Sequence, residues 1–143
     1  MDKRLKRILS ILLTTLVAMT AIYFSGQSGE ESHALSGRAA RWLLDRLYFT
    51  NTVETLELIE YLLRRGAHFI IYTVMGWGLM RTFQDWVAFP LVATVMIGAL
   101  FACTDEIHQI FSIGRSAKLT DVFLDTCGVT AGGLLQVLQN KLR

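Results

Sequence analysis

Side chains that can transfer protons, hold a phosphate group or bind a cation occur in four short stretches of the chain. These are Gln27 and Ser28; Arg64, Arg65, His68 and Tyr72; Asp105, Glu106, His108 and Gln109; and Arg115, Asp121 and Asp125. A histidine near carboxylates suits acid–base or metal-assisted chemistry, and arginines hold phosphate or carboxylate groups through paired hydrogen bonds. Which chemistry applies depends on the elements that bring the four stretches together.

The composition predicts an apolar environment for most of the chain. The 143 residues are 52% hydrophobic and 18% charged, and 2 of them are cysteine. Such a chain is too apolar to be disordered, and two cysteines are too few for a disulfide-stapled secreted scaffold. The net charge of +2 comes without a long basic tract, which argues against a nucleic-acid partner. The composition therefore leaves two classes of protein: a very apolar soluble protein or a small integral membrane protein.

Segment length favours the membrane protein. Residues 8–24 and 86–104 carry no charge, 66–80 is an uncharged run between arginines, and 119–138 holds two Asp among apolar and small residues. A bilayer core of roughly 30 Å needs about 20 helical residues, and flanking arginines can reach the headgroups. We predict an all-α integral membrane four-helix bundle, a single domain of residues 1–143, with spans at about 8–24, 62–80, 86–104 and 119–138.

Residues 32–61, between the first two spans, are predicted to form two short amphipathic helices. Apolar residues recur at helical spacing from Leu35 to Leu47, and Asn51 followed by Glu54 resembles a capping box that starts a helix over 53–63. Four aromatic residues favour a place in the outer membrane interface: Trp42, Tyr48, Phe49 and Tyr61. A small helical cap packed on the bundle is an equally good interpretation.

The basic residues before the first span predict the orientation. Lys3, Arg4, Lys6 and Arg7 place the N-terminus in the cytoplasm. A cleaved signal peptide is less favoured, because its apolar region normally runs about 7–15 residues. Alternating spans then put the C-terminus in the cytoplasm and residues 25–65 and 105–118 outside. A count of all Lys and Arg residues does not strengthen this prediction, because in this topology each side of the membrane carries seven of them.

In this topology all four polar stretches lie at the outer ends of the spans, while the inner halves carry almost no polar residue. Asp121, Asp125, Gly128 and Gly132 share one face of a helix, and the two glycines form a GxxxG pair that permits close helix packing. The two carboxylates therefore point into protein. An unpaired Asp at a span centre costs about 2.5 to 3.5 kcal/mol on insertion scales, so Asp125 needs a partner, a proton or water.

The order and spacing of these motifs resemble the VanZ-like family over roughly residues 8–138. The matching residues are FSGQSGEES at 24–32, RRGAHF at 64–69 with Tyr72, DEIHQIF at 105–111, and GRS at 114–116 with Asp121, Asp125, Gly128 and Gly132. The chain has Ile113, Ile71, Arg65 and Asp125 where relatives commonly have Pro, Glu, Lys and Asn. The resemblance implies a small multi-helix membrane protein. The family's namesake is associated with low-level teicoplanin resistance in Gram-positive bacteria.

Our leading hypothesis is a cell-envelope protein whose outer-leaflet cavity binds an anionic lipid or a cell-wall precursor headgroup, with a possible effect on glycopeptide susceptibility implied by the resemblance. The expected ligand-binding residues are Gln27, Ser28, Arg64, Arg65, Tyr72, Gln109, Arg115 and Asp125. Whether the ligand is also modified stays open, and so does any cofactor. The candidate catalytic residues are His68, His108, Asp105, Glu106 and Asp121.

Other functions are compatible with the same residues. The main alternative is a non-catalytic membrane scaffold whose buried polar network only fixes helix packing. No metal ligands are assigned, because the chain has no HExxH and Asp-Glu-x-His is not a specific ligand pattern. A metal-assisted site remains a minor alternative, since bundle cores do use carboxylates with histidine. A transporter is least favoured, because the polar groups do not run through the full thickness.

Overall fold

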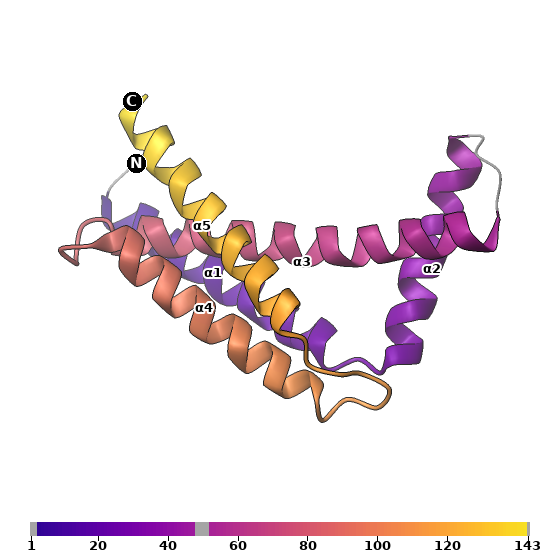
Figure 1. Cartoon of the computed structure of the whole chain (residues 1–143). Coiled ribbons are helices and arrows are strands. Elements are labelled where there is room, and N and C mark those ends of the chain that lie inside the picture. Colours follow the sequence, from indigo (N-terminus) through magenta and orange to yellow (C-terminus); the bar gives the residue numbers. More distant parts are fainter. Residues whose placement is uncertain (1–2, 48–51, 143) are drawn as a thin grey trace.

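Five α-helices make up the described chain (Figure 1). The computed structural model describes residues 3–47 and 52–142, and these contain no strand. The helices are α1 (Lys3–Ser25), α2 (Gly29–Arg46), α3 (Val53–Phe83), α4 (Pro90–Gln109) and α5 (Leu119–Lys141). The predicted all-α class is therefore confirmed.

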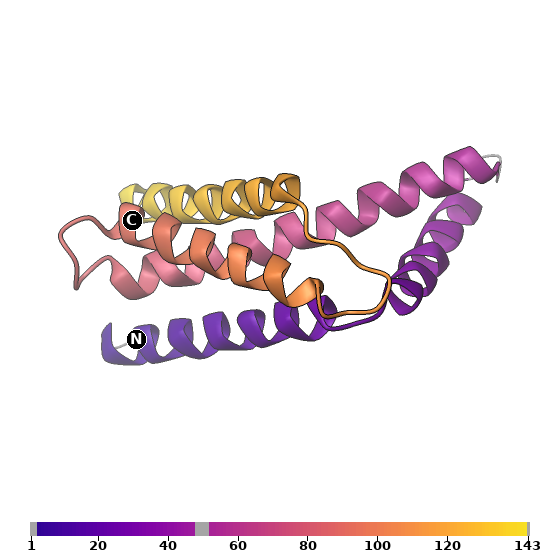
Figure 2. The ribbon, with the colours of Figure 1, turned by 60° about the horizontal axis from the view of Figure 1, so that its bottom comes forward.

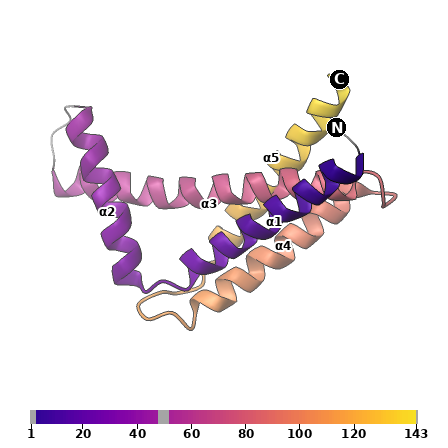
Figure 3. The ribbon, with the colours of Figure 1, turned by 180° about the vertical axis from the view of Figure 1, so that it is seen from behind.

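Helix α3 contacts each of the other four helices. Figures 1 and 2 show α1, α4 and α5 along its C-terminal part, while α2 folds back against its N-terminal part. Figure 3 shows from behind that α1 and α4 run side by side. A small hydrophobic core of Tyr72, Met75, Ala102 and Val129 joins α3, α4 and α5.

Glycines bring α3 and α5 into direct backbone contact. A methyl group added at Gly132 would collide with the carbonyl oxygen of Thr73, and one added at Gly128 would lie 2.8 Å from the carbonyl oxygen of Phe69. Gly76 on α3 faces the backbone of Val129 in the same way. The Gly128–Gly132 pair thus permits the close helix approach that its spacing predicts.

The molecule has many large apolar side chains on its outside and a set of polar side chains inside, unlike a soluble protein. Leu12, Leu16 and Met19 on α1 are each at least 60% exposed. The buried polar residues of the described chain are Ser10, Ser25, Thr94, Asp105, Glu106, Gln109, Asp125 and Gln136. Lipid tails are the solvent that suits such a surface. Helices α1, α4 and α5 are long and apolar enough to cross a membrane.

The second predicted amphipathic helix and the second predicted span are one helix. No proline interrupts residues 53–83, so α3 runs for 31 residues, about 46 Å. It contains residues 62–80 but is not among the three helices that are long and apolar enough to cross a membrane. Its N-cap is Thr52, whose side chain accepts from the backbone of Thr55. The predicted cap Asn51, together with Tyr48 and Phe49, lies outside the described residues.

The third span is also displaced from its predicted bounds. Helix α4 begins at Pro90 rather than at Trp86, because proline occupies the first helical position and residues 84–89 form a turn. The helix then continues past Thr104 to Gln109. Asp105 and Glu106 are therefore part of its last turns and not of a loop.

A polar network also exists where the sequence indicated almost none. The start of α1, the end of α5 and the turn at 84–89 lie at one end of the molecule (Figure 1). At this end Asn140 Nδ2 donates to Gln84 Oε1 at 2.7 Å, and Gln136 Nε2 donates to Asn140 Oδ1 at 3.0 Å. We call this the terminal end. The opposite end, with the turn at 26–28 and the loop at 110–118, is the loop end.

We expect the Gly132→Ala substitution to lower the free energy of unfolding by about 1 to 3 kcal/mol, because the new methyl group must separate two packed backbones. Gly66→Ala is the matched control, since Gly66 lies within α3 with nothing within 4 Å of an added methyl group. That variant should gain up to about 1 kcal/mol from helix propensity. Thermal unfolding in detergent, followed by circular dichroism, measures both. Equal melting temperatures for the two variants would contradict the close packing.

Candidate functional site

The loop at 110–118 is joined to the end of α1 and the start of α2 by three hydrogen bonds. The backbone N–H of Gly29 donates to the Ile113 carbonyl at 2.8 Å, and the Ser112 hydroxyl donates to the Ser25 carbonyl at 3.1 Å. Arg115 Nη1 donates to the Phe24 carbonyl at 2.9 Å. The bonds to Ser25 and Phe24 satisfy carbonyl groups that the C-terminus of α1 leaves without partners in the helix. They also bring two of the four polar stretches together.

Two glycines make this contact possible. Gly114 has a φ of +74°, in the left-handed region that favours glycine. A methyl group at Gly29 would lie 2.5 Å from the Gly114 carbonyl oxygen. Gly114 allows the loop to turn, and Gly29 allows the loop to approach α2. The close contact needs both glycines.

Glu106 connects the end of α4 to the start of α5. Its carboxylate accepts a hydrogen bond from the Lys118 backbone N–H at 2.7 Å and another from Gln109 Nε2 at 3.0 Å. Lys118 is the N-cap of α5 and provides no side-chain cap of its own. A carboxylate here satisfies a free N–H group and interacts favourably with the helix dipole. Both Glu106 oxygens thus have structural partners.

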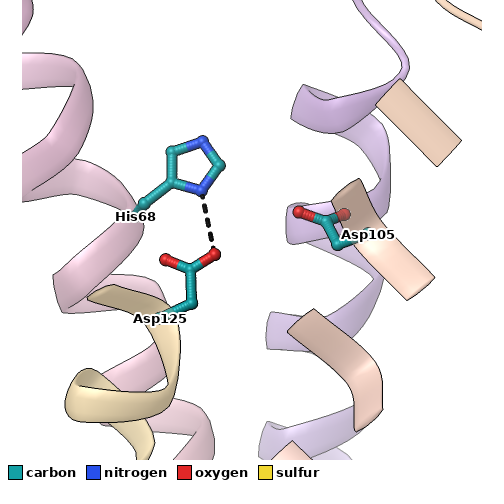
Figure 4. A group of neighbouring side chains, drawn as sticks. All are labelled: His68, Asp105 and Asp125. Atoms are coloured by element: carbon teal, nitrogen blue, oxygen red, sulfur yellow. Dashed lines mark ion pairs between the residues drawn. The ribbon is translucent and has the colours of Figure 1, made fainter. Parts of the chain in front are cut away.

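His68, Asp105 and Asp125 come together from three different helices (Figure 4). His68 Nδ1 lies 3.6 Å from Asp125 Oδ2, and one potential ligand atom from each of the three residues lies within 4.8 Å of the others. Asp105 and Asp125 are buried, and His68 is partly exposed. Among the described residues, neither carboxylate has a hydrogen-bond partner, and neither does the buried Tyr72 hydroxyl.

Three arginines lie beside this cluster, and each has a different partner. Arg65 forms an ion pair with Asp121 and lies over the Tyr61 ring. Arg64 Nη2 lies 3.5 Å from Glu60 Oε1. Arg115 is held by the Phe24 carbonyl, and burial together with the charge of Arg64 lowers the pKa of its guanidinium below the usual range. An anion placed between Arg64 and Arg115 would relieve that repulsion.

Two cavities meet at these residues. The first, of about 310 Å³, lies between α1, α2 and α3 and has mainly apolar walls, which include Ala21, Phe24, Leu35, Ala39, Leu63, Ala67 and Ile71. The second, of about 240 Å³, has mainly polar walls, which include His33, Arg65, Gln109, Lys118 and Asp121. We call them the apolar cavity and the polar cavity. Arg64, His68 and Arg115 line both.

Most of the predicted site residues reach this region. Gln27 and Tyr72 line the apolar cavity, while Arg65, Gln109 and Asp121 line the polar one. Asp105, Asp125 and Glu106 are buried at the loop end in the contacts described above.

Two predicted residues lie elsewhere. The side chain of His108 is exposed although it lies only one turn after buried Asp105 on α4, and its ring is close to Gly26. Ser28 caps α2 through a capping box with Glu31, and its hydrogen bonds lower the pKa of the Glu31 carboxyl. Neither residue lines either cavity.

The sequence did not identify two residues that line the polar cavity, His33 and Lys118. His33 lies on α2 and reaches the cavity because α2 folds back on α3, where its Nδ1 contacts Glu60 Oε1 at 2.5 Å. No local pattern announces that contact between distant segments. Lys118 comes two residues after the Gly-Arg-Ser motif at 114–116, and this closeness in sequence could have suggested that Lys118 lines the same cavity.

Comparison with known proteins supports the resemblance noted from the motifs. No curated protein and no solved structure matches the chain. A model of the VanZ/LLP1 family matches residues 10–140, which include every residue of the two cavities and of the His68–Asp105–Asp125 cluster. With nearly its whole length matched, and with helices suited to a bilayer, the chain is a membrane protein of the VanZ/LLP1 family.

Proposed function

We propose that the two cavities bind one amphiphilic ligand, an anionic lipid or a lipid-linked cell-wall precursor. The anionic headgroup occupies the polar cavity and part of the lipid chain occupies the apolar cavity. The observation that carries this proposal is that Arg64, His68 and Arg115 line both cavities. A molecule with a charged head and an apolar tail is the ligand class that matches an apolar and a cationic cavity in contact.

The charges of the polar cavity favour an anion. Arg64, Arg65, Arg115 and Lys118 line it, and Asp121 is the one carboxylate among its lining residues. Arginine holds phosphate and carboxylate groups through two parallel hydrogen bonds. Because Asp121 already pairs with Arg65, the headgroup would contact mainly Arg64 and Arg115.

We further propose that the protein crosses the membrane four times, with residues 62–80 of α3 as the second span and both termini in the cytoplasm. The start of α1 and the end of α5 lie at the same end, as an even number of spans requires (Figure 1). At this terminal end Arg7 and Arg81 lie over the rings of Trp86 and Trp77, which is the aromatic and basic composition of a membrane interface. The cavities then open in the outer leaflet.

A link to glycopeptide susceptibility belongs to the same proposal. Teicoplanin acts on cell-wall precursors at the outer face of the membrane, where the proposed headgroup site lies. Modification of the ligand would involve His68, the partly exposed member of the buried cluster, which lines both cavities. His108 and Glu106 are weaker candidates for that role, because one is exposed away from the cavities and the other has structural partners.

The alternative function is a non-catalytic scaffold whose polar network fixes helix packing. The Arg65–Asp121 pair and the bonds of Glu106 favour it, since these contacts are complete within the protein. The carboxylates of Asp105 and Asp125, which are buried without a hydrogen bond in the described chain, argue against it, because a network that serves packing alone should satisfy its buried members.

Binding of defined lipids tests the ligand class. We expect the purified protein to bind phosphatidylglycerol or undecaprenyl phosphate and to show little affinity for phosphatidylcholine in a detergent-based titration. Arg64→Gln should weaken binding by about tenfold or more, since a hydrogen bond to a charged group contributes about 1.5 to 3 kcal/mol.

Arg81→Gln is the control for that titration, because Arg81 lies on the same helix at the terminal end, away from both cavities. Equal binding of phosphatidylcholine, or an equal loss in Arg81→Gln, would contradict an anion site between the cavities. It would leave the scaffold as the better account.

Labelling of single cysteines in intact cells tests the orientation. Ile113, at the loop end, and Phe89, at the terminal end, are 85% and 74% exposed. With Cys103 and Cys127 replaced by alanine, we expect Ile113→Cys to react with a membrane-impermeant maleimide and Phe89→Cys to react only after the cells are permeabilised. The reverse pattern would place the cavities on the cytoplasmic side.

A further inference from the structure

We propose that His68, Asp105 and Asp125 bind a divalent transition-metal cation, Zn²⁺ or Mn²⁺. The three residues come from α3, α4 and α5, and their potential ligand atoms lie within 4.8 Å of one another. Figure 4 shows the side chains of His68 and Asp125 directed toward each other, with the Asp105 carboxylate on the facing helix. This proposal does not depend on the identity of the lipid ligand.

The main observation is a set of buried oxygen atoms without partners. All four carboxylate oxygens of Asp105 and Asp125 lack a hydrogen bond among the described residues, although both residues are at most 3% exposed. Buried carboxylates are otherwise paired, hydrogen-bonded or bound to a metal. The buried Tyr72 hydroxyl likewise lacks a hydrogen bond of normal geometry, and it lies near enough to Asp105 for the two groups to interact. Five buried oxygen atoms thus lack a hydrogen bond in one place, and the ion pair with His68 engages one of them. We take this as the sign of a bound species.

The spacing of His68 and Asp125 is that of an ion pair, and it is also compatible with a shared cation. The 3.6 Å between His68 Nδ1 and Asp125 Oδ2 is too long for a hydrogen bond between nitrogen and oxygen. Two ligand atoms on a tetrahedral ion with bonds of about 2.0 Å are separated by about 3.3 Å. The observed pair therefore lies near the separation that a metal ion would impose.

The donor set indicates the type of metal. Imidazole nitrogen suits zinc and other transition ions, whereas calcium and magnesium prefer all-oxygen sites. Two carboxylates balance the charge of a divalent ion inside the protein. Three protein ligands would leave a position open for a further ligand, and one of the three, His68, lines both cavities.

The neighbouring acids do not share these properties. Asp121 pairs with Arg65, and Glu106 accepts two hydrogen bonds from Lys118 and Gln109. Both are therefore satisfied without a metal. Sequence spacing did not indicate the site, because each of the three ligands comes from a different helix and no pair of them forms a local motif.

Metal binding by the full-length protein in detergent tests the proposal. After removal of metals with a chelator, Zn²⁺ and Mn²⁺ are added separately, and the bound metal is measured by inductively coupled plasma mass spectrometry. We expect about one ion per chain for at least one of the two metals, with a rise in melting temperature. Asp105→Asn and Asp125→Asn should each weaken binding by about tenfold or more.

Asp121→Asn is the matched control and should bind the metal like the unmodified chain. His68→Gln serves where an Asp variant does not fold, because His68 is partly exposed and glutamine keeps a polar side chain at the position. No stoichiometric binding of either metal by the unmodified protein, or an equal loss in Asp121→Asn, would overturn the metal site. Lipid binding that depends on Arg64 would still stand in that case, so the two proposals fail separately.

Discussion

The close contact between the backbones of α3 and α5 is the constraint on which the rest of the structure depends. Gly128 and Gly132 present no side chain to α3, so the two helices approach until the carbonyl groups of Phe69 and Thr73 limit them. Asp125 lies one turn before Gly128 on the same face, and it therefore meets α3 next to His68. A larger residue in the contact would separate the histidine from the carboxylate. The packing glycines and the chemistry-bearing residues are thus one feature of the sequence.

The membrane environment explains why polar side chains gather near this contact. Because the outer surface is apolar, the polar side chains of the spans can find partners only inside the molecule. Most do so: Glu106 caps α5, Arg65 pairs with Asp121, and Gln84, Gln136 and Asn140 bond to one another. Asp105 and Asp125 are the buried acids whose oxygens lack a hydrogen bond in the described chain, and Asp125 has an ion pair with His68. His68 in turn lines both cavities.

Patterns within one segment of the sequence predicted the structure of that segment well. Features that depend on contacts between distant segments were not predicted. The uncharged run after the basic N-terminus predicts α1, and the stripe of Asp125, Gly128 and Gly132 predicts the buried face of α5. The continuity of α3 was missed because its polar first half and apolar second half read as two helices. His108 was grouped with Asp105 from helical spacing, yet it lies far enough around α4 to be exposed. The role of Glu106 depends on a backbone group of Lys118, which no sequence pattern reveals.

Native mass spectrometry of the protein extracted from its membrane in a mild detergent tests most directly whether the joined cavities hold an anionic amphiphile. We predict that a fraction of the chains retains a single lipid with a net negative charge, enriched over its share of the membrane, and that this species is lost when Arg115 is replaced by glutamine. A protein that carries no lipid, or carries lipids in their membrane proportions with zwitterionic species included, would contradict the account.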